Sequence, residues 1–430
     1  MVTGSVASLR DRRALDWLNF FLADVKDGLG PFLAVFLASA EHWDPGQIGL
    51  VLTLGGLATV LARGPSGALV DAVRWKRGMI AGAAVAVAVA SGTMALFPHL
   101  WPVLAAQVVN GVADAVFPSA IAAISLGIVG REMFTQRVGR NESFNHSVNV
   151  VTAIVAGLAG RYVAPGAVLW IAAGLALVSI VATFAVNGRA IDHTVARGGD
   201  RDGGDADEDE DEGEDGGAKP SGLRVIFECR PLLMFTAAIT LFHFANAAML
   251  PLLGQKLSQG QAQSGSLFVA ACIVTAQIVM VPMAFLVGRQ ADIWGRKALF
   301  LVGFAALPIR GVLYTLVDSP VSLVAVQILD GVAAGIFGVL FFIVVADLTK
   351  GTGRYNLALG ASAACWGLGA AMSNAVAGMI VNRFGFDAAF LFLAACAVFA
   401  FLLFWLGVPE THTSRAPGRA GAPTPGAVAS

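Results

Sequence analysis

The chain has 430 residues, of which 57% are hydrophobic and only 13% are charged. Average soluble proteins carry about 25% charged residues, so this composition excludes an ordinary soluble protein. The formal net charge is −1, which offers no electrostatic basis for binding nucleic acid, and no nucleic-acid partner is expected. The four cysteines form no CxxC pair and no cluster with histidine. Neither a disulfide nor a metal site is therefore expected.

Long apolar runs predict membrane-spanning helices. A crossing takes about 20 apolar residues, and runs such as 78–98 contain no charge at all. Trp43, Asp44 and Pro45 follow the first run in place of small residues, so we interpret it as a retained span and not as a cleaved signal peptide. Within lipid the backbone must satisfy its own hydrogen bonds, which favours helices. We place twelve spans at 15–39, 47–70, 78–98, 101–129, 142–164, 167–187, 232–254, 264–288, 298–317, 320–348, 355–381 and 386–408.

The distribution of Lys and Arg predicts the orientation of these spans. Of the 28 basic residues, three lie within spans (Lys26, Arg63 and Arg310) and three in loops assigned to the outside (Arg161, Lys256 and Arg383). The other 22 lie in the termini and in the alternate loops. Because basic loops stay in the cytoplasm, both termini are expected there. The prediction is an all-α multi-pass protein of the cytoplasmic (inner) membrane.

A hydrophilic segment at 188–231 separates spans 6 and 7. Within it, Asp200–Asp215 contains eleven acidic residues, and such a composition cannot bury a core. We interpret the segment as a solvated, disordered linker, with a regulatory role as the alternative. The expected organisation is an N-terminal six-helix bundle (1–187), an acidic cytoplasmic linker (188–231), a C-terminal six-helix bundle (232–408) and a disordered cytoplasmic tail (409–430).

The two sets of six spans repeat each other. Pro31 corresponds to Pro251 at an offset of 220 residues, and Gly139-Arg140 corresponds to Gly353-Arg354 at 214. Further pairs at offsets of 220 or 221 are Gly67 with Gly288, Asp71 with Asp292, Gln107 with Gln327, and Gly111 with Gly331. Ordered repeats at matching depths indicate duplication, and transporters commonly bind substrate between such repeats.

The loops after spans 2 and 8 carry a recognisable motif. They read Gly67-Ala-Leu-Val-Asp71-Ala-Val-Arg74-Trp-Lys76-Arg77 and Gly288-Arg-Gln-Ala-Asp292-Ile-Trp-Gly295-Arg296-Lys297. Both resemble the loop signature of the major facilitator superfamily, glycine-x-x-x-aspartate-x-x-glycine-arginine-lysine. The second copy fits, whereas the first has Arg74 at the position of the second glycine. The resemblance implies two pseudosymmetric six-helix bundles around a central cavity. It also implies a conformational latch formed by Gly67, Asp71, Lys76, Arg77, Gly288, Asp292, Gly295, Arg296 and Lys297.

Two further elements depart from patterns of that family. Gln107-Val-Val-Asn110-Gly111 resembles its arginine-x-x-glutamine-glycine element, but glutamine replaces the arginine. Span 5 lacks the glycine-proline element that is usual in drug/proton antiporters. These departures weaken an arginine-mediated coupling mechanism and a standard drug-exporter assignment.

Charged residues inside spans mark a candidate site, because each costs about 2.5–3.5 kcal/mol near the bilayer centre. Span 1 carries Asp24, Lys26 and Asp27, followed by a predicted break at Gly28–Pro31. Span 4 carries Gln107, Asn110 and Asp114 on one face. In the family, spans 1 and 4 line the cavity, and crowded carboxylates there favour the protonated form. The alternative is a structural salt bridge between Lys26 and one carboxylate.

Other polar residues complete the candidate proton-coupling and substrate cavity. They are His146 in span 5, His243 and Asn246 in span 7, and Gln327 and Asp330 in span 10. His146 could equally be a hydrogen-bonded histidine near the cytoplasmic surface. Arg310 and Asp330 lie at similar depth, so we predict that they pair, in a role more structural than substrate-binding.

These observations predict a secondary active transporter that moves a small solute by alternating access, coupled to protons. Export by antiport and uptake by symport both remain open. No Walker nucleotide-binding motif, HExxH or GxSxG occurs, so the chain is not expected to be an enzyme or to bind a cofactor. A non-transporting membrane sensor is the less favoured alternative. The expected partners are the lipid bilayer, a small-molecule substrate and protons, and a monomer is expected.

Overall fold

The computed structural model describes residues 9–27, 29–197, 226–227, 229–259, 262–350 and 354–411. These residues are almost entirely helical, and no strand occurs among them. Most of the expected acidic linker, and the tail beyond residue 411, lie outside the described residues, so the predictions made for them stay predictions. Below, "N-half" denotes residues 9–197 and "C-half" residues 226–411.

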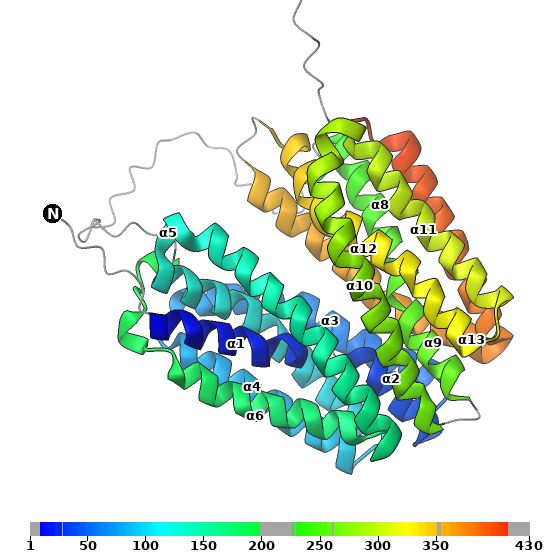
Figure 1. Cartoon of the computed structure of the whole chain (residues 1–430), viewed down its shortest axis with the longest axis horizontal. Helices are drawn as coiled ribbons and strands as arrows, with labels where there is room; N and C mark the ends of the chain where they lie inside the picture. The colour runs from blue at the N-terminus through cyan, green and yellow to red at the C-terminus, as the bar shows by residue number, and fades with distance from the viewer. Residues whose placement is uncertain are drawn as a thin grey trace, which may run out of the picture.

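The N-half contains six α-helices and two short 3₁₀ turns among its described residues (Figure 1). They are α1 (Leu9–Asp27), α2 (Leu29–Ser39), α3 (Pro45–Ala72), α4 (Lys76–Leu96), α5 (Leu100–Tyr162), α6 (Ala167–Ala185), η1 (Gly188–Ala190) and η2 (Val195–Arg197). Asp44 caps α3 by accepting a hydrogen bond from the Gln47 N–H at 3.0 Å, which satisfies one of the unpaired donors of the first turn.

The C-half contains a second series of helices, grouped apart from the first in Figure 1. They are α8 (Arg230–Ala247), α9 (Met249–Ser258), α10 (Ala262–Trp294), α11 (Arg296–Leu316), α12 (Pro320–Leu348) and α13 (Tyr355–Gly407). Ser319 and Pro320 begin α12 with a side-chain cap and a proline in the first turn, where proline removes no helical hydrogen bond.

Two of the helices contain a sharp bend at a glycine. Gly130 in α5 has φ +74°, and Gly385 in α13 has φ +85°. L-residues rarely adopt this region, whereas glycine does so without a steric penalty. Our span assignments place a loop at 130–141, and this expectation is wrong. The structure instead bends at Gly130 and continues as helix, so α5 holds both of the expected spans.

The number of spans can be compared with the lengths of the helices. Nine helices among the described residues are long and apolar enough to cross a membrane. Two shorter apolar helices cover 30–39 and 148–162. The helix at 357–407 is counted once, although it contains the bend at Gly385. The expected total of twelve spans therefore stays a prediction.

The first span of the C-half is interrupted near the proline that matches Pro31. In the N-half, the described residues stop at Asp27 in α1 and resume at Leu29 in α2; Gly28 lies outside them, so the break predicted at Gly28–Pro31 stays a prediction. In the C-half, α8 ends at Ala247 and α9 begins at Met249. Pro251 is the third residue of α9, and Pro31 is the third residue of α2 as it is described from Leu29. Proline is tolerated in the first turn of a helix, which suits the place of Pro251 in α9.

Each half buries its own apolar core. One buried cluster lies wholly in the C-half, from Ile226 to Val408, and another lies wholly in the N-half, from Ala14 to Ala196. A third cluster belongs to the N-half but includes Val269 and Ala270 of α10. The two halves are therefore packed separately and share apolar surface in one region.

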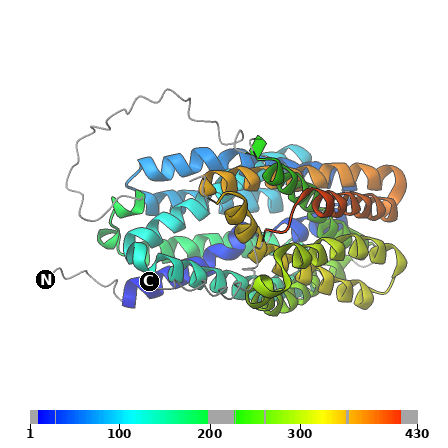
Figure 2. The same cartoon turned by 90° about the horizontal axis from the view of Figure 1, so that it is seen from above.

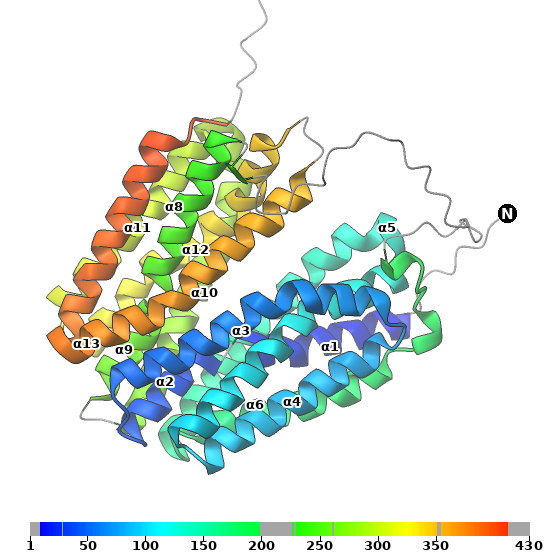
Figure 3. The ribbon, with the colours of Figure 1, turned by 180° about the vertical axis from the view of Figure 1, so that it is seen from behind.

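Contact between the halves runs mainly through four helix pairs, α3 with α13, α5 with α10, α2 with α9, and α2 with α10. Figures 1 and 3 show α2, α9 and the bend of α13 gathered at one end of the molecule, whereas the opposite ends of the two groups diverge. Figure 2, seen from above, shows the two groups side by side along the long axis. The halves thus converge at the end where α3 begins.

Glycine allows α3 and α13 to meet backbone to backbone. A Cβ atom on Gly49 would lie 2.2 Å from the Asn374 carbonyl oxygen, and one on Gly378 would lie 2.3 Å from the Pro45 carbonyl oxygen. Thr53 strengthens the contact, since its hydroxyl donates to the Ala371 carbonyl at 2.8 Å and accepts from the Ala375 N–H at 2.9 Å. We call this contact between α3 and α13 the seal.

Gly378→Ala should loosen the seal, because its methyl group would collide with backbone that cannot rotate away. We expect a cost of about 1–3 kcal/mol, typical of overpacking, and faster hydrogen–deuterium exchange in residues 45–56 and 371–382. Gly360→Ala is the matched control in the same helix, because a Cβ there meets nothing within 4 Å. Equal exchange in the two variants would contradict this account of the seal.

Candidate functional site

A cavity of about 440 Å³ lies between the two halves, beyond the seal. Its polar lining comes from both halves, with Thr59, Gln107, Asn110 and Asp114 on one side and Asn246, Arg310, Asp330 and Asn374 on the other. A second hollow of about 370 Å³ shares Leu52, Gly56, Thr59, Asp114, Ala247 and Asn374 with it. The second hollow adds Arg63, Pro118 and Trp366. Because they share these lining residues, we treat the two as one central cavity.

The order of residues along α3 shows which end of the cavity is closed. Gly49 and Thr53 form the seal, Gly56 and Thr59 line both hollows, and Arg63 lines only the second. The cavity therefore extends from the seal toward the end of α3, which leads into the loop that carries the Asp71 motif. Arg63 is an exposed cation within an expected span, and the cavity gives it a polar surrounding.

The predicted polar face of span 4 lines the cavity. Gln107 and Asn110 are buried in its wall and contact each other, with the Asn110 amide 3.5 Å from the Gln107 side-chain oxygen. Asp114 lines both hollows. Close packing of α5 against α3 fixes the orientation of this polar face. A Cβ on Gly111 would lie 2.2 Å from the Gly55 carbonyl oxygen of α3, so glycine is needed at this contact. The stripe thus presents two amides and a carboxyl group to one polar space.

A buried arginine organises the wall formed by the C-half. Arg310 of α11 is 2% exposed and forms an ion pair with Asp330 of α12, which confirms the predicted pairing. Its other contacts lie on both sides of the break in span 7. It donates to the Asn246 side-chain oxygen at 2.5 Å in α8 and contacts the Met249 sulfur at 3.3 Å in α9. Arg310 therefore links the cavity to the helix that contacts α2 of the other half.

Two of the predicted site residues lie away from the lining. His243 sits in an aromatic cluster, with its ring centroid 4.3 Å from that of Trp366 and 4.5 Å from that of Phe337. Gln327 is 1% exposed and packs within the C-half. A helical period predicts the face of a residue but not which neighbour covers that face. His243 still adjoins the site, because Trp366 lines the second hollow.

The side chains of Asp24, Lys26, Asp27 and His146 lie outside the part of the chain that the structure describes. Their predicted roles in the cavity stay predictions. Sequence reasoning named Arg63 as a basic residue within a span without placing it in the candidate site. Thr59 was missed, and its spacing of four residues from Arg63 on α3 was the available signal.

The second loop motif forms a compact polar cluster. Asp292 pairs with Arg296 at 3.2 Å, and Arg296 also pairs with Asp347 of α12. Gly295 has φ +85°, a region that suits glycine, and starts α11. Glu410 caps this helix by accepting the N–H groups of Arg296 and Lys297 at 3.1 and 3.0 Å. Gly288 is exposed, and a Cβ there would meet nothing within 4 Å.

The first copy of the motif is arranged differently. Asp71 is exposed, and Gly67 lies near Ser119 of α5. Lys76 is 1% exposed and donates to the Val70 carbonyl at 2.5 Å. Arg77 donates to the Val186 carbonyl at 2.8 Å. The basic residues of this copy therefore satisfy backbone carbonyls of their own half, and the latch role of both copies stays a prediction.

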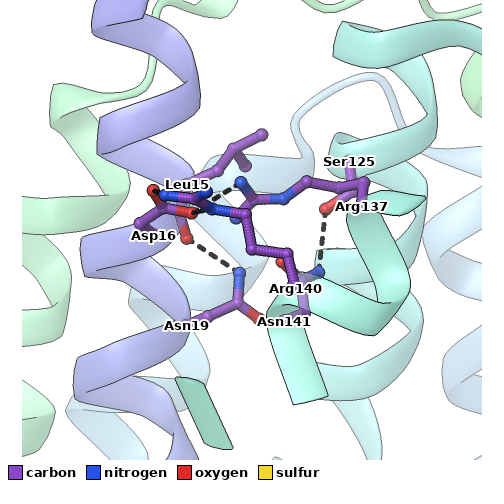
Figure 4. A network of polar contacts seen from close by, with 7 residues as sticks. All are labelled: Leu15, Asp16, Asn19, Ser125, Arg137, Arg140 and Asn141. Atoms are coloured by element: carbon purple, nitrogen blue, oxygen red, sulfur yellow. Dashed lines mark hydrogen bonds and ion pairs between the residues drawn. The ribbon is translucent and has the colours of Figure 1, made fainter. Parts of the chain in front are cut away.

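A buried carboxylate ties α1 to α5 (Figure 4). Asp16 accepts from Arg137 at 2.6 Å and from Arg140 at 2.7 and 2.9 Å. Its side chain is 10% exposed, so the arginines supply the charge compensation that burial requires. Asn19 and Asn141, drawn beside this pair in Figure 4, donate to Leu15 and Ser125. Sequence reasoning missed Asp16, although Arg140 belongs to a repeated Gly-Arg pair.

The comparisons with known proteins agree with this geometry. The profile of the Major Facilitator Superfamily matches residues 16–280 and 232–428. Two Mycobacterium tuberculosis proteins, the MFS-type transporters MT2531 of strain CDC 1551 / Oshkosh and Rv2456c of strain ATCC 25618 / H37Rv, are each 47% identical over 415 residues, which is 96% of this chain and 97% of theirs. The chain therefore belongs to the Major Facilitator Superfamily of membrane transporters.

Solved structures share the fold at low sequence identity. A mutant of the nucleoside transporter NupG superposes with a TM-score of 0.76 at 16% identity, over 92% of this chain and 99% of that one. A D-xylose-proton symporter gives 0.68 at 12% identity, over 93% and 97%. These values establish the arrangement of helices and leave the substrate to be argued from the cavity.

Asp330→Asn should destabilise the protein, because it leaves a buried guanidinium without its countercharge. We expect a loss of about 3–5 kcal/mol, measured by thermal unfolding in detergent. Asp387→Asn is the control, since Asp387 is 60% exposed and pairs with Lys256 at 2.9 Å, where about 0–1 kcal/mol is expected. The double variant Arg310→Met/Asp330→Leu should recover much of the loss. If Asp330→Asn were as stable as the control, the ion pair would not hold the C-half wall.

Proposed function

We propose that this chain is a secondary active transporter that moves a small polar solute through the central cavity by alternating access. The observation that carries the proposal is a polar cavity lined by both halves and closed at one end by the seal. A solute bound there contacts both the N-half and the C-half, so relative movement of the halves can expose it to the other side of the membrane. The break between α8 and α9 places irregular backbone beside the cavity, as is common in transporters, and we expect the same at Gly28–Pro31.

The proposal includes an orientation in the membrane. The open end of the cavity lies on the side of the loop motifs, where the excess of Lys and Arg predicts the cytoplasm. The conformation described here is then inward-facing, with twelve spans and both termini in the cytoplasm. Exposed apolar side chains such as Leu61, Val181 and Phe285 suit a lipid-facing surface.

We assign the coupling role to Asp114. Asp114 lines both hollows, on the wall opposite the ion pair of Arg310 and Asp330. A carboxyl group in a cavity that opens alternately to each side can take a proton from one side and release it to the other. Gln107 and Asn110 supply neutral hydrogen-bonding groups beside it, which suits a polar solute. This arrangement supports coupling through protons.

Counterflow in proteoliposomes tests the proposal. Vesicles loaded with the transported solute, identified from a thermal-shift screen of a solute library, should accumulate labelled solute without any ion gradient. Asp114→Asn should retain this exchange but lose uptake or release driven by a pH gradient, because the variant cannot carry the proton. Absence of counterflow for every solute that binds would remove the transport proposal.

Asp318→Asn is the matched control for that measurement. It makes the same chemical change in an exposed loop residue outside the cavity lining, and it should behave like the unchanged protein. Gradient-driven transport at the normal rate in Asp114→Asn would show that the proton is carried elsewhere.

A further inference from the structure

A separate hollow of about 650 Å³ lies where α1 and α4 begin and α6 ends. It is lined by Asp11, Arg77 and the run 184–189, and it shares no lining residue with the central cavity. Phe184 is 52% exposed at its rim. Phe184, Asn187 and Arg189 of its lining are exposed, so the hollow is reached from the surface of the N-half.

Arg77 is held in a fixed position within the hollow. Its guanidinium donates to the Val186 carbonyl at 2.8 Å and lies 5.9 Å from the centre of the Phe184 ring. A Cβ on Gly188 would lie 2.1 Å from an Arg77 nitrogen, so glycine leaves the space that the guanidinium occupies. Arg189 is exposed and follows directly in η1. Two guanidinium groups and one carboxylate, that of Asp11, therefore line the same space, which gives its lining a net positive charge.

The C-half can be compared with the N-half at the place where the last helix of each half ends. Arg189 and Glu410 each follow the last helix of their half, since α6 ends at Ala185 and α13 ends at Gly407. Glu410 follows the last helix of the C-half and supplies a carboxylate to the start of α11. In the N-half the equivalent residue is an arginine, and a hollow lies where the C-half holds an anion of its own. Among the lining residues that the structure describes, two arginines stand against the single carboxylate of Asp11, and this balance favours an anionic ligand.

The surface beside the hollow indicates the source of that anion. Leu177, Val181 and Phe184 lie on one face of α6 and are 53%, 72% and 52% exposed. They form an apolar stripe that ends at the two arginines. Arginine binds phosphate with two parallel hydrogen bonds, and basic pockets at the cytoplasmic ends of spanning helices bind anionic lipid headgroups. An acyl chain along the stripe would bring its phosphate to the hollow.

We propose that this hollow binds the phosphate of an anionic phospholipid of the inner leaflet. The lipid supplies to the N-half the negative charge that Glu410 supplies to the C-half. The site acts on stability and is independent of the solute and of the coupling proton. Its tests therefore measure lipid binding and unfolding, and they read out separately from transport.

The first experiment measures lipid retention by the full-length protein in native mass spectrometry, with phosphatidylglycerol against phosphatidylcholine. The unchanged protein should retain phosphatidylglycerol preferentially. Arg77→Gln and Arg189→Gln should each weaken that retention about fivefold. Arg74→Gln, an exposed arginine of the same loop outside the lining, should leave it unchanged. Equal losses in all three variants, or a preference that survives in both site variants, would overturn the proposal.

A charge-reversal variant distinguishes loss of lipid binding from poor folding. Arg189→Glu gives the N-half the residue type that Glu410 provides in the C-half. It should abolish the preference for phosphatidylglycerol while the melting temperature in phosphatidylcholine rises to that of the unchanged protein in phosphatidylglycerol. Unaltered lipid preference would contradict the proposal. Glycerol 3-phosphate tests a soluble phosphate in place of the lipid. If it raises the melting temperature as much as phosphatidylglycerol does, the ligand is a free phosphate and not a lipid.

Discussion

Backbone contact between α3 and α13, at Gly49 and Gly378, determines how the two halves of this transporter are arranged. Because no side chain separates the helices there, the halves meet closely at one end and diverge toward the other. The central cavity follows from that divergence, and its lining begins directly beyond the seal at Gly56 and Thr59. Thr53 satisfies a carbonyl and an N–H of α13, so closure in this state includes specific polar contacts as well as packing.

The two walls of the cavity have different physical characters. In the C-half, Arg310 is buried against Asp330 and contacts both helices that flank the break in span 7. The second of these helices, α9, packs against α2 of the other half. In the N-half, Asp114 and two amides face the cavity from α5. One wall therefore carries a paired charge that connects to the contact between halves, and the other carries the group that we assign to the proton.

Much of this arrangement could be predicted from single residues and their spacing. The polar face of span 4 followed from a helical period, and the Arg310–Asp330 pair followed from equal depth in neighbouring spans. The contacts of Asp16 with Arg137 and Arg140 could not be predicted, because they depend on which helices become neighbours. The bend at Gly130 was missed because an isolated glycine gives no sign of its φ angle. His243 was assigned to the cavity although aromatic rings surround it.

Distances across the two ends of the molecule test alternating access most directly. Double electron–electron resonance would use one pair of spin labels at the open end, at Arg74 and Ile293, and another at the closed end, at Val163 and Phe384, all of them exposed positions. On addition of the transported solute with an imposed change of pH, the first distance should shorten while the second lengthens. Distances that stay constant, or that change in the same direction at both ends, would contradict transport by alternating access in this protein.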